Sequence, residues 1–495
     1  MLFLFALLIV VAVFSTKLSS RAGIPVLIVF IGLGILVGSD VLDIIYFDDA
    51  NLTKQIADFL LIFILFTGGF QTKKAVLKSV AAPALGLATV GVLLTALGLG
   101  VLIHFVTGLP LTNSLMISSI ISSTDAAAVM MVTRDTPVRE RVASTLNVES
   151  AANDPMAILL TLGFVQIVSG KSASVPSFIF SLLWQFAGGV LVGFILAKVA
   201  RYLFDHLESE NRGYYYVLII GVILLAYGFA DMIKANGTLA VFFMGYWLGN
   251  SEFVCKRGVS NFLEGISTFG NVALFLLLGL LAFPHKFVAI WQEGLLIAAL
   301  MIFVVRPVVV WICTLPFKYS AREKLFISWG GIKGAVPIVL ATYPAAYGIA
   351  GSDRIFNIIF FTVLLSCVLQ GSTMGLLAKW LKITVPLRPH SPYSVELHTV
   401  RKSDLDMFEI QVEKGSAAEG LRIRDLPLPR DALISSIVRD ERIIPPRGTT
   451  SILADDILFV LAPTRNIDKI SYIINQPRPQ LDEKARLENE IESRR

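Results

Sequence analysis

Residues 148–155 read VESAANDP, and they open an otherwise apolar run that continues through Phe164. Two carboxylates, Glu149 and Asp154, and the carboxamide of Asn153 therefore stand where hydrocarbon is expected. On a helix, Glu149 and Asn153 share a face because they are four residues apart, while Asp154 lies about 100° further round and can point into a neighbouring cavity. An ionisable side chain at membrane depth costs roughly 2.5 to 3.5 kcal/mol on insertion scales, so we interpret this group as functional.

The composition is that of a chain embedded in a lipid bilayer. Of its 495 residues, 55% are hydrophobic and 16% are charged, and the mean hydropathy is +0.73, which predicts a polytopic membrane protein. The net charge of +5 comes from Lys and Arg residues spread between apolar runs, which indicates cytoplasmic loops and no nucleic-acid surface. The three cysteines lie far apart without a CxxC pair, so we expect neither a disulfide framework nor a metal site.

Apolar runs of about 20 residues mark membrane-spanning helices, and shorter runs are admissible where a helix is broken or tilted. The sequence predicts about thirteen spans, in the approximate windows 2-15, 24-38, 56-70, 81-106, 114-133, 149-169, 177-200, 214-233, 237-250, 262-283, 288-316, 325-346 and 354-378. The first window has no basic residues before it and no Ala-x-Ala pattern after it, so we expect a retained span and not a cleaved signal peptide. Lys and Arg gather in alternate loops, which predicts a cell-membrane protein with its N-terminus outside and its C-terminus in the cytoplasm.

A weak internal repeat relates residues 117–129 to residues 327–337. Both are small-residue stretches inside apolar helices, and each carries one charge, Asp125 in the first and Lys333 in the second. The two helices lie seven apart in the predicted order, so they run in opposite directions. Inverted repeats with interrupted helices are typical of secondary transporters, whose substrate lies between the repeats near the midplane. We therefore predict two broken helices that cross in the membrane.

The composition changes after Lys379, so we divide the chain into a membrane domain at 1–383 and a cytoplasmic part. A short proline-containing linker is predicted at 384–393. A small α+β domain is predicted at 394–475, because alternating apolar positions there indicate short strands, with a closing helix near 467–474. Residues 476–495 alternate in charge without an apolar stripe, and we expect them to form a solvated tail.

Asp154 is the sharpest candidate for ion binding. A lone carboxylate in a partly dry cavity holds either a proton or a monovalent cation, because two bound charges and an empty charged site are both costly there. If the empty site cannot cross the barrier, each conformational change carries one or the other, and exchange follows. The alternative is that Asp154 is buried only to pair with a basic neighbour.

Four charged residues lie at predicted membrane depth, namely Asp125, Glu149, Asp154 and Lys333. Unpaired, they would cost of order 10 to 14 kcal/mol, which is comparable with the net stability of many proteins. We therefore predict that Glu149 pairs with Lys333, which leaves Asp154 free to exchange its ligand. Thr124, Ser150 and carbonyls exposed by a helix break would offer neutral oxygens to an alkali ion.

No motif of enzyme chemistry appears in a suitable context. The chain lacks a Gly-rich phosphate loop, HExxH, CxxC and a GxSxG elbow where they would be needed, so we predict that it is not an enzyme and that it needs no cofactor. Arg306, followed by Pro307 within a predicted span, is expected to be a structural partner or to mark a kink.

Three segments carry a family resemblance, and they read STD at 123–125, ESAANDP at 149–155 and WGGIKG at 329–334. In order and spacing they resemble the signature segments of bacterial NhaP-type monovalent cation:proton antiporters, over nearly all of residues 1–380. The resemblance implies a thirteen-helix protomer, usually a homodimer, which exchanges one cation for one proton at Asp154. The residues that it assigns to the ion site are Asp154, Asn153, Thr124, Asp125 and Ser150.

Two positions depart from the family pattern. Thr67, which we also assign to the cation site, stands in the third span where many relatives have an acidic residue. Fewer fixed charges at the site favour a larger, more easily dehydrated ion such as K⁺. Lys333 stands where many members have an arginine that pairs with the counterpart of Glu149. Lysine keeps the charge but loses the bidentate geometry.

The segment 408–463 resembles a TrkA-C (RCK-C) regulatory domain. Such domains accompany potassium channels and transporters, often dimerise and in some cases bind a nucleotide, so a nucleotide effector is an expectation for this domain. With NhaP-type proteins this addition is commonly associated with potassium/proton exchange. We therefore expect K⁺ rather than Na⁺ as the exchanged cation.

Other functions stay open beside electroneutral K⁺/H⁺ exchange. A Na⁺(Li⁺)/H⁺ antiporter is the nearest alternative. A gated cation channel is disfavoured because no carbonyl filter of the TVGYG type appears. A nucleotide sensor with a degenerate membrane anchor would bind a ligand and transport nothing.

Overall fold

The computed structural model describes residues 2–22, 26–47, 49–125, 129, 136–170, 175–385, 405–440 and 442–476. The chain divides into two compact units, Met1–Pro386 and Leu387–Arg495, and each has its own hydrophobic core. The predicted linker beyond residue 385 and the predicted tail beyond residue 476 lie outside the described residues. So do positions 126–128 of the predicted internal repeat.

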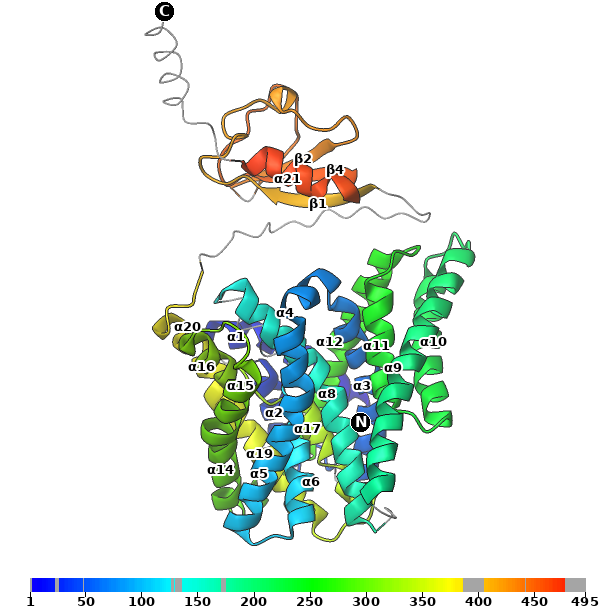
Figure 1. The fold of residues 1–495 in the computed structure, drawn as a ribbon, viewed down its shortest axis with the longest axis vertical. Helices are drawn as coiled ribbons and strands as arrows, with labels where there is room; N and C mark the ends of the chain where they lie inside the picture. The colour runs from blue at the N-terminus through cyan, green and yellow to red at the C-terminus, as the bar shows by residue number, and fades with distance from the viewer. Residues whose placement is uncertain are drawn as a thin grey trace, which may run out of the picture. The chain divides into compact units, whose positions relative to one another are not determined.

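The first unit is built of long apolar helices (Figure 1). Among the described residues, 8 helices have the length and composition to cross a membrane, and shorter apolar helices accompany them. This confirms a polytopic helical membrane domain, whereas the count of thirteen spans stays a prediction. The long helices are α3 (Ala50–Gln71), α4 (Lys74–Gly86) with α5 (Val92–Thr107), α8 (Glu140–Val168), α9 (Val175–His206), α10 (Gly213–Met232), α12 (Lys256–Leu280), α14 (Trp291–Ala299) with α15 (Arg306–Thr314), and α19 (Ser352–Ser366) with α20 (Ser372–Trp380). The other helices are α1 (Leu2–Ala22), α2 (Val26–Val37), α6 (Leu111–Ile121), α11 (Gly237–Gly249), α13 (Pro284–Phe287), α16 (Ala321–Trp329), α17 (Ala335–Leu340) and α18 (Tyr343–Ala346).

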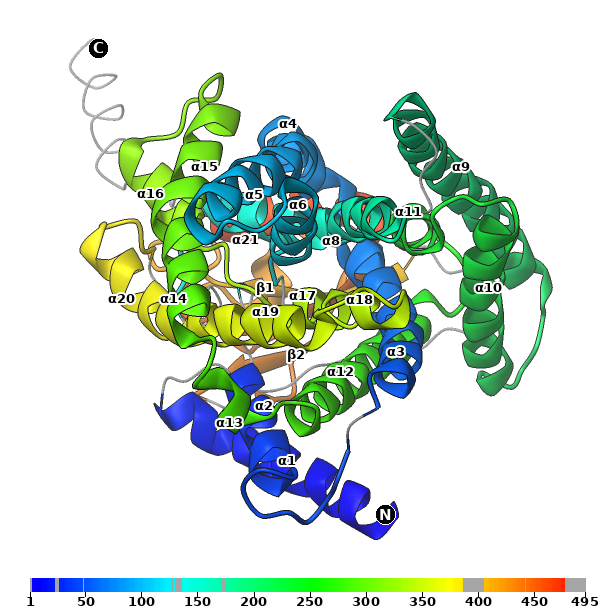
Figure 2. The ribbon, with the colours of Figure 1, turned by 90° about the horizontal axis from the view of Figure 1, so that it is seen from below.

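Helix α3 packs closely against α11 through small residues. A Cβ at Gly69 would lie 2.1 Å from the carbonyl oxygen of Phe242, and a Cβ at Gly245 would lie 2.3 Å from that of Phe66. Both distances are far inside van der Waals contact, so the two backbones approach this closely because glycine has no side chain. Helix α12 packs along α3 as well, and Figure 2 shows α3 between α12 and α11. These three helices form one tightly packed group.

Helical structure stops at two places inside the first unit, where the sequence predicts broken helices. Helix α6 ends at Ile121, and residues 123–125 belong to no helix; α16 ends at Trp329, and α17 begins at Ala335. The two breaks touch, because the N–H of Asp125 donates to the carbonyl of Ile332 over 2.7 Å. A Cβ at Gly334 would lie 2.5 Å from Oδ2 of Asp125, so any other residue there would have to displace the Asp125 side chain.

The second unit is a small antiparallel sheet covered by one helix. Its strands are β1 (Leu405–Gln411), β2 (Leu433–Arg439), β3 (Arg442–Ile444) and β4 (Ile457–Pro463), in the order β1-β4-β2-β3. Helix α21 (Ile467–Asn475) buries Ile470 and Ile474 in a core that includes Leu458 of β4. The buried carboxylate of Asp456 receives two hydrogen bonds from the guanidinium of Arg439, at 2.8 and 2.7 Å. The predicted strand-containing domain with a closing helix is confirmed.

The glycine contact between α3 and α11 gives a stability prediction. Replacing Gly69 by alanine should lower the free energy of unfolding by about 1 to 3 kcal/mol, because the new Cβ must push two helix backbones apart. The loss is measured as a lower unfolding temperature of the detergent-purified protein. Gly221→Ala on α10 is the matched control, since no atom lies within 4 Å of a Cβ there, and it should leave the temperature unchanged or raise it slightly. Equal unfolding temperatures for the two variants would contradict the packing argument.

Candidate functional site

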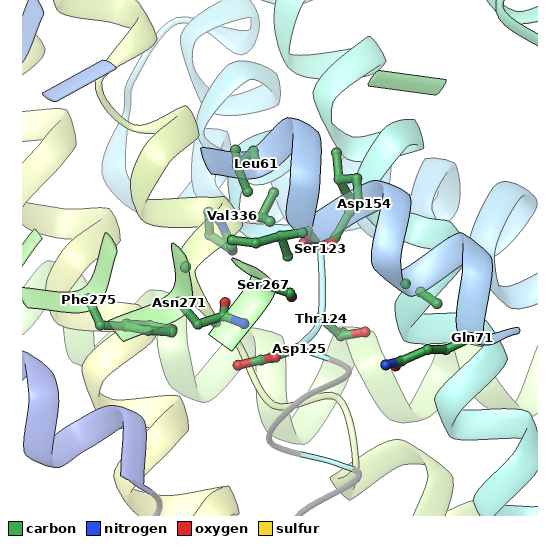
Figure 3. Close-up of a pocket in the computed structure, with 17 residues that line it drawn as sticks. Leu61, Gln71, Ser123, Thr124, Asp125, Asp154, Ser267, Asn271, Phe275 and Val336 are labelled. Carbon is green, nitrogen blue, oxygen red and sulfur yellow. Dashed lines mark hydrogen bonds between the residues drawn. The ribbon is translucent and has the colours of Figure 1, made fainter. Parts of the chain in front are cut away.

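Asp154 lies midway along α8, and its side chain is half-buried. Its Oδ1 accepts a hydrogen bond from the hydroxyl of Ser123, in the segment where α6 has already ended. Figure 3 shows the two side chains pointing toward one another. Pro155 follows inside the same helix and has no N–H, so the carbonyl of Ala151 lacks its helical donor. The carboxylate is therefore placed between an intact helix and the break of another.

A second polar group fixes the broken segment to α8. The side-chain amide of Asn153 donates to Oγ1 of Thr124 over 2.5 Å, and the same Oγ1 lies 2.9 Å from the hydroxyl of Ser150. The N–H of Thr124 donates to Oδ1 of Asn153 at 3.4 Å. All three side chains are buried, so each polar atom is satisfied within the protein. This network holds the non-helical backbone at a fixed height beside Asp154.

A cavity of about 180 Å³ opens beside Asp154, and it has two distinct walls. One wall carries the candidate ion-site residues from the breaks and from α8, and the other comes from α3 and α12. The residues of the first wall are Ser123, Thr124, Asp125, Ala151, Asp154, Gly334, Ala335, Val336 and Pro337; those of the second are Leu61, Ile64, Leu65, Gly68, Gln71, Ser267, Asn271 and Phe275. Gln71 is exposed at the end of α3, so the cavity reaches the surface there.

The polar residues of the second wall were not predicted from the sequence. Gln71, Ser267 and Asn271 line the cavity opposite the carboxylates, and Figure 3 shows the Asn271 amide and Asp125 on the same part of the cavity. A weak signal was available, since Ser267 and Asn271 are four residues apart and share a face of α12. These groups provide neutral oxygens facing the acidic wall.

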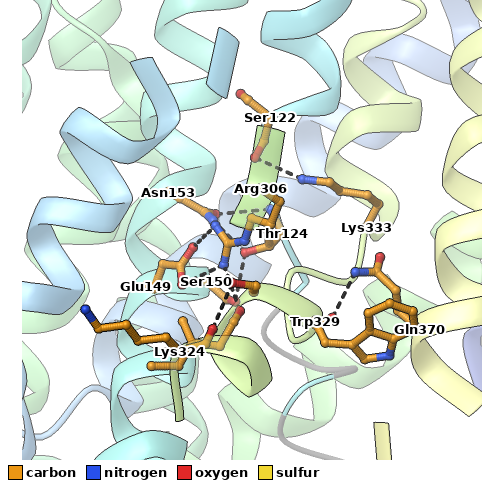
Figure 4. A network of polar contacts seen from close by, with 12 residues as sticks. Ser122, Thr124, Glu149, Ser150, Asn153, Arg306, Lys324, Trp329, Lys333 and Gln370 are labelled. Carbon is orange, nitrogen blue, oxygen red and sulfur yellow. Dashed lines mark hydrogen bonds and ion pairs between the residues drawn. The ribbon is translucent and has the colours of Figure 1, made fainter. Parts of the chain in front are cut away.

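The predicted pairing of Glu149 with Lys333 is wrong. The partner of Glu149 is Arg306, whose Nη1 and Nη2 lie 2.6 and 2.9 Å from the two carboxylate oxygens (Figure 4). Both side chains are almost fully buried, at 5% and 0% exposure. A guanidinium reaches both oxygens at once, which an ammonium cannot do, and this geometry suits a pair removed from water. The expectation of a structural partner for Arg306 is met by this carboxylate.

Lys333 instead contacts the end of the other broken helix. Its Nζ donates to the carbonyl of Ser122 over 3.2 Å, where α6 leaves carbonyl groups without helical partners. Its own backbone is held by the end of α19, since its N–H donates to the hydroxyl of Ser366 at 3.1 Å. Lys333 therefore complements a helix C-terminus across the crossing.

Thr67 does not line the cavity. Its hydroxyl donates to the carbonyl of Phe63 in the preceding turn at 2.8 Å, and it faces the carbonyl of Leu263 on α12 at 3.5 Å. Of the other predicted ion-site residues, Asp154, Thr124 and Asp125 line the cavity. Ser150 and Asn153 lie behind Thr124 and hold it.

Two crossed, broken helices beside a carboxylate in a membrane cavity define a secondary active transporter for a small cation. Residues 5–380 match the family described as "Sodium/hydrogen exchanger, transmembrane", and residues 407–474 match the TrkA-C domain. The chain belongs to the sodium/hydrogen exchanger family. It is accordingly a membrane cation/proton antiporter and not an enzyme.

Similar proteins agree with this assignment. The "K(+)/H(+) antiporter NhaP2" of Shewanella oneidensis is 34% identical over 97% of this chain and 84% of its own length. The "K(+)/H(+) antiporter NhaP" of Alkalimonas amylolytica is 30% identical over 94% of this chain and 82% of its own. The solved structure of the sodium proton antiporter MjNhaP1 from Methanocaldococcus jannaschii superposes with a TM-score of 0.68 at 27% identity, over 77% of this chain and 98% of that one.

The buried ion pair gives a second prediction. Arg306→Met should lower the free energy of unfolding by about 3 to 5 kcal/mol, because Glu149 is then buried without its partner. The unfolding temperature in detergent measures this loss, and the double variant Glu149→Gln/Arg306→Met should recover part of it. Arg354→Met is the matched control, because its ion pair with Glu293 leaves the arginine 63% exposed, and its effect should stay below about 1 kcal/mol. Equal losses in the two arginine variants would refute this role for the pair.

Proposed function

We propose that the protein exchanges K⁺ for H⁺ across the cell membrane, one for one, at Asp154. One observation carries the proposal: among the described residues, no basic side chain lies within the 4.0 Å ion-pair distance of this cavity-lining carboxylate. Its described partner is the neutral hydroxyl of Ser123. A carboxylate that is not committed to a fixed cation is free to exchange a proton for a mobile one.

The electroneutral stoichiometry is supported by how the other charges are used. Glu149 is neutralised by Arg306, and the Lys333 ammonium is engaged with the end of α6. Asp154 then binds either one proton or one monovalent cation in each transport step. The restriction that the empty, charged site does not cross gives exchange without net charge movement, because the same charge state crosses in both directions.

The choice of K⁺ rests on three observations. The Shewanella and Alkalimonas relatives are named K⁺/H⁺ antiporters, the chain carries a TrkA-C domain, and Thr67 places no acidic group beside the cavity. The runner-up, Na⁺(Li⁺)/H⁺ exchange, is supported by an archaeal relative named "Na(+)/H(+) antiporter 1", which is 28% identical over 77% of this chain. Both ions suit carboxylate, hydroxyl and carbonyl oxygens.

The conformation described here is inward-open on the predicted orientation. The cavity reaches the surface at Gln71, and Lys73, Lys74 and Lys78 follow directly in the next turn and helix. Basic loops of this kind face the cytoplasm. The N-terminus then lies outside and the C-terminus inside, and the protomer works as a homodimer, as the family resemblance implies.

Regulation by the cytoplasmic domain, with a nucleotide as a candidate effector, has a structural route. The segment that leaves α20 pairs with the segment that precedes α8: the N–H of Val385 donates to the carbonyl of Pro137 at 2.9 Å, and that of Arg139 donates to the carbonyl of Ile383 at 3.2 Å. Arg139 also pairs with Glu323 in the first turn of α16, at 3.1 Å. A displacement of residues 383–385 would therefore be transmitted to α8, which carries Asp154, and to α16, which ends shortly before Lys333.

The transport proposal is tested in liposomes with a preset pH gradient. Addition of K⁺ should collapse the gradient, and Asp154→Asn should abolish the collapse because an amide neither releases a proton nor balances a cation. Asp231→Asn on α10 makes the same chemical change at an exposed position and should keep the wild-type rate. Comparison of K⁺, Na⁺, Li⁺ and Rb⁺ across pH ranks the cations. Undiminished exchange in Asp154→Asn would refute the site, and a rate with Na⁺ above that with K⁺ would favour the runner-up.

The regulatory route is tested at Val385. Deleting residues 390–495 should change the exchange rate, and Val385→Pro should change it in the same direction by about fivefold, because it removes the N–H bonded to Pro137. Val385→Ala keeps that N–H and is the matched control. If truncation alters the rate while Val385→Pro behaves like Val385→Ala, this segment does not carry the regulation.

A further inference from the structure

The cavity lies along the boundary between two groups of helices. Helix α3 is packed tightly on α11 and α12, as the glycine contacts at Gly69 and Gly245 require. It touches α8, α17 and α18 much more lightly. The two cavity walls follow the same division, so a relative movement of the groups would open or close the cavity.

Along α3 the cavity lining runs from Gln71, which is exposed, to Leu61, ten residues earlier, which is only 2% exposed, so we take the cavity as open at Gln71 and closed near Leu61. Asp58 comes one helical turn before Leu61, beyond the closed end. On the opposite wall, α17 lines the cavity with Val336 and Pro337, and the chain then continues past the closed end into α18. The two helix groups therefore meet again at this level.

A three-residue contact joins the groups at that level. The hydroxyl of Tyr343, the first residue of α18, donates to Oδ1 of Asp58 over 2.8 Å. Lys54, one turn earlier on α3, donates to Oδ2 of the same carboxylate over 2.7 Å. Its Nζ also lies 4.5 Å from the centroid of the Tyr343 ring. The tyrosine is 6% exposed, whereas Lys54 and Asp58 keep 24% and 22%, so the contact is a partly buried one at the mouth opposite Gln71.

We infer that Lys54, Asp58 and Tyr343 form a gate, here called the outer lock, that keeps the side of the cavity opposite Gln71 closed while Gln71's side is open. This inference rests on the proposed alternating access at Asp154. The contacts of Tyr343 with Asp58 and Lys54 cross the boundary between the two helix groups. They exist only while α18 and α3 keep this relative position. The lock therefore favours one transport conformation over the other, which is the condition for shifting the equilibrium between them.

The outer lock affects the equilibrium between the two transport conformations and not ion binding at Asp154. Tyr343 and Asp58 do not line the cavity and touch no ion-site residue, so they are positioning residues. A hydrogen bond to a charged acceptor supports a shift of roughly tenfold in such an equilibrium. Loss of the lock raises the population open on the Asp58 side, and it leaves the carboxylate at Asp154 intact.

The test uses a cysteine probe in the full-length protein. Cys255, Cys313 and Cys367 are replaced by alanine, and Leu61→Cys supplies the probe at the end of the cavity nearest the lock. Membrane-impermeant maleimide is applied to right-side-out and to inverted vesicles. The probe in the otherwise unchanged protein should react from the Gln71 side and only slowly from the Asp58 side.

Tyr343→Phe should raise the labelling rate from the Asp58 side by roughly tenfold, because the ring remains and the hydrogen bond is lost. Lys54→Gln, at the more exposed position, should raise it in the same direction. Tyr46→Phe is the matched control, since that residue is 70% exposed in the loop before α3, and it should change nothing. Continued labelling from the Gln71 side shows that each variant is folded.

Labelling needs no transport, so its outcome separates the two proposals. Faster labelling from the Asp58 side in Tyr343→Phe, with exchange absent in the wild-type protein, would uphold the lock and refute the transport function. Unchanged labelling from that side in both Tyr343→Phe and Lys54→Gln would overturn the lock. If Tyr343→Phe does not fold, the result with Lys54→Gln decides.

Discussion

The ion pair between Glu149 and Arg306 is the interaction on which the site depends. Two carboxylates lie five residues apart on α8, and both cannot stay charged and unpaired where water is scarce. The guanidinium of Arg306 forms an ion pair with Glu149, and both partners are almost fully buried. Asp154 is thereby left as the carboxylate of α8 that has a neutral partner, Ser123, among the described residues, as the proposed exchange requires. The same pair ties α8 to α15, so the helix that carries the ion site cannot move without its neighbours.

The helix breaks solve a second problem, which is how to bring backbone and polar side chains to membrane depth. Irregular backbone is tolerated there only where it is buried in protein or lines a cavity. Here the breaks satisfy one another: Asp125 N–H bonds the carbonyl of Ile332, and Lys333 bonds the carbonyl of Ser122. Glycine at position 334 lets the two segments cross. The polar groups at one helix break are thus hydrogen-bonded by polar groups at the other.

Much of this arrangement could be predicted from the chain, because its signals are local. Apolar runs long enough to cross the hydrocarbon layer predicted the membrane helices. The acidic and amide residues of 148–155 predicted that α8 carries the candidate ion site. Small residues with one charge identified both breaks. The partner of Glu149 could not be predicted in this way, since the choice between Arg306 and Lys333 depends on tertiary distance and reach. Thr67 misled for a different reason: a hydroxyl in a helix can always bond the carbonyl one turn back, and here it does. The polar wall of Gln71, Ser267 and Asn271 depends on how α3 and α12 are rotated, which single-sequence patterns do not fix.

Pro155 has a consequence for ion coordination. It stands one residue after Asp154, the proposed exchange site, and supplies no N–H, so the Ala151 oxygen has no donor from its own helix. Ala151 is also part of the cavity wall. An alkali ion that sheds water needs several uncharged oxygens besides one anion, and a carbonyl released by a cyclic residue is such a ligand with no added charge. The same helix can thus supply the fixed negative charge and a dipole that replaces a lost water molecule.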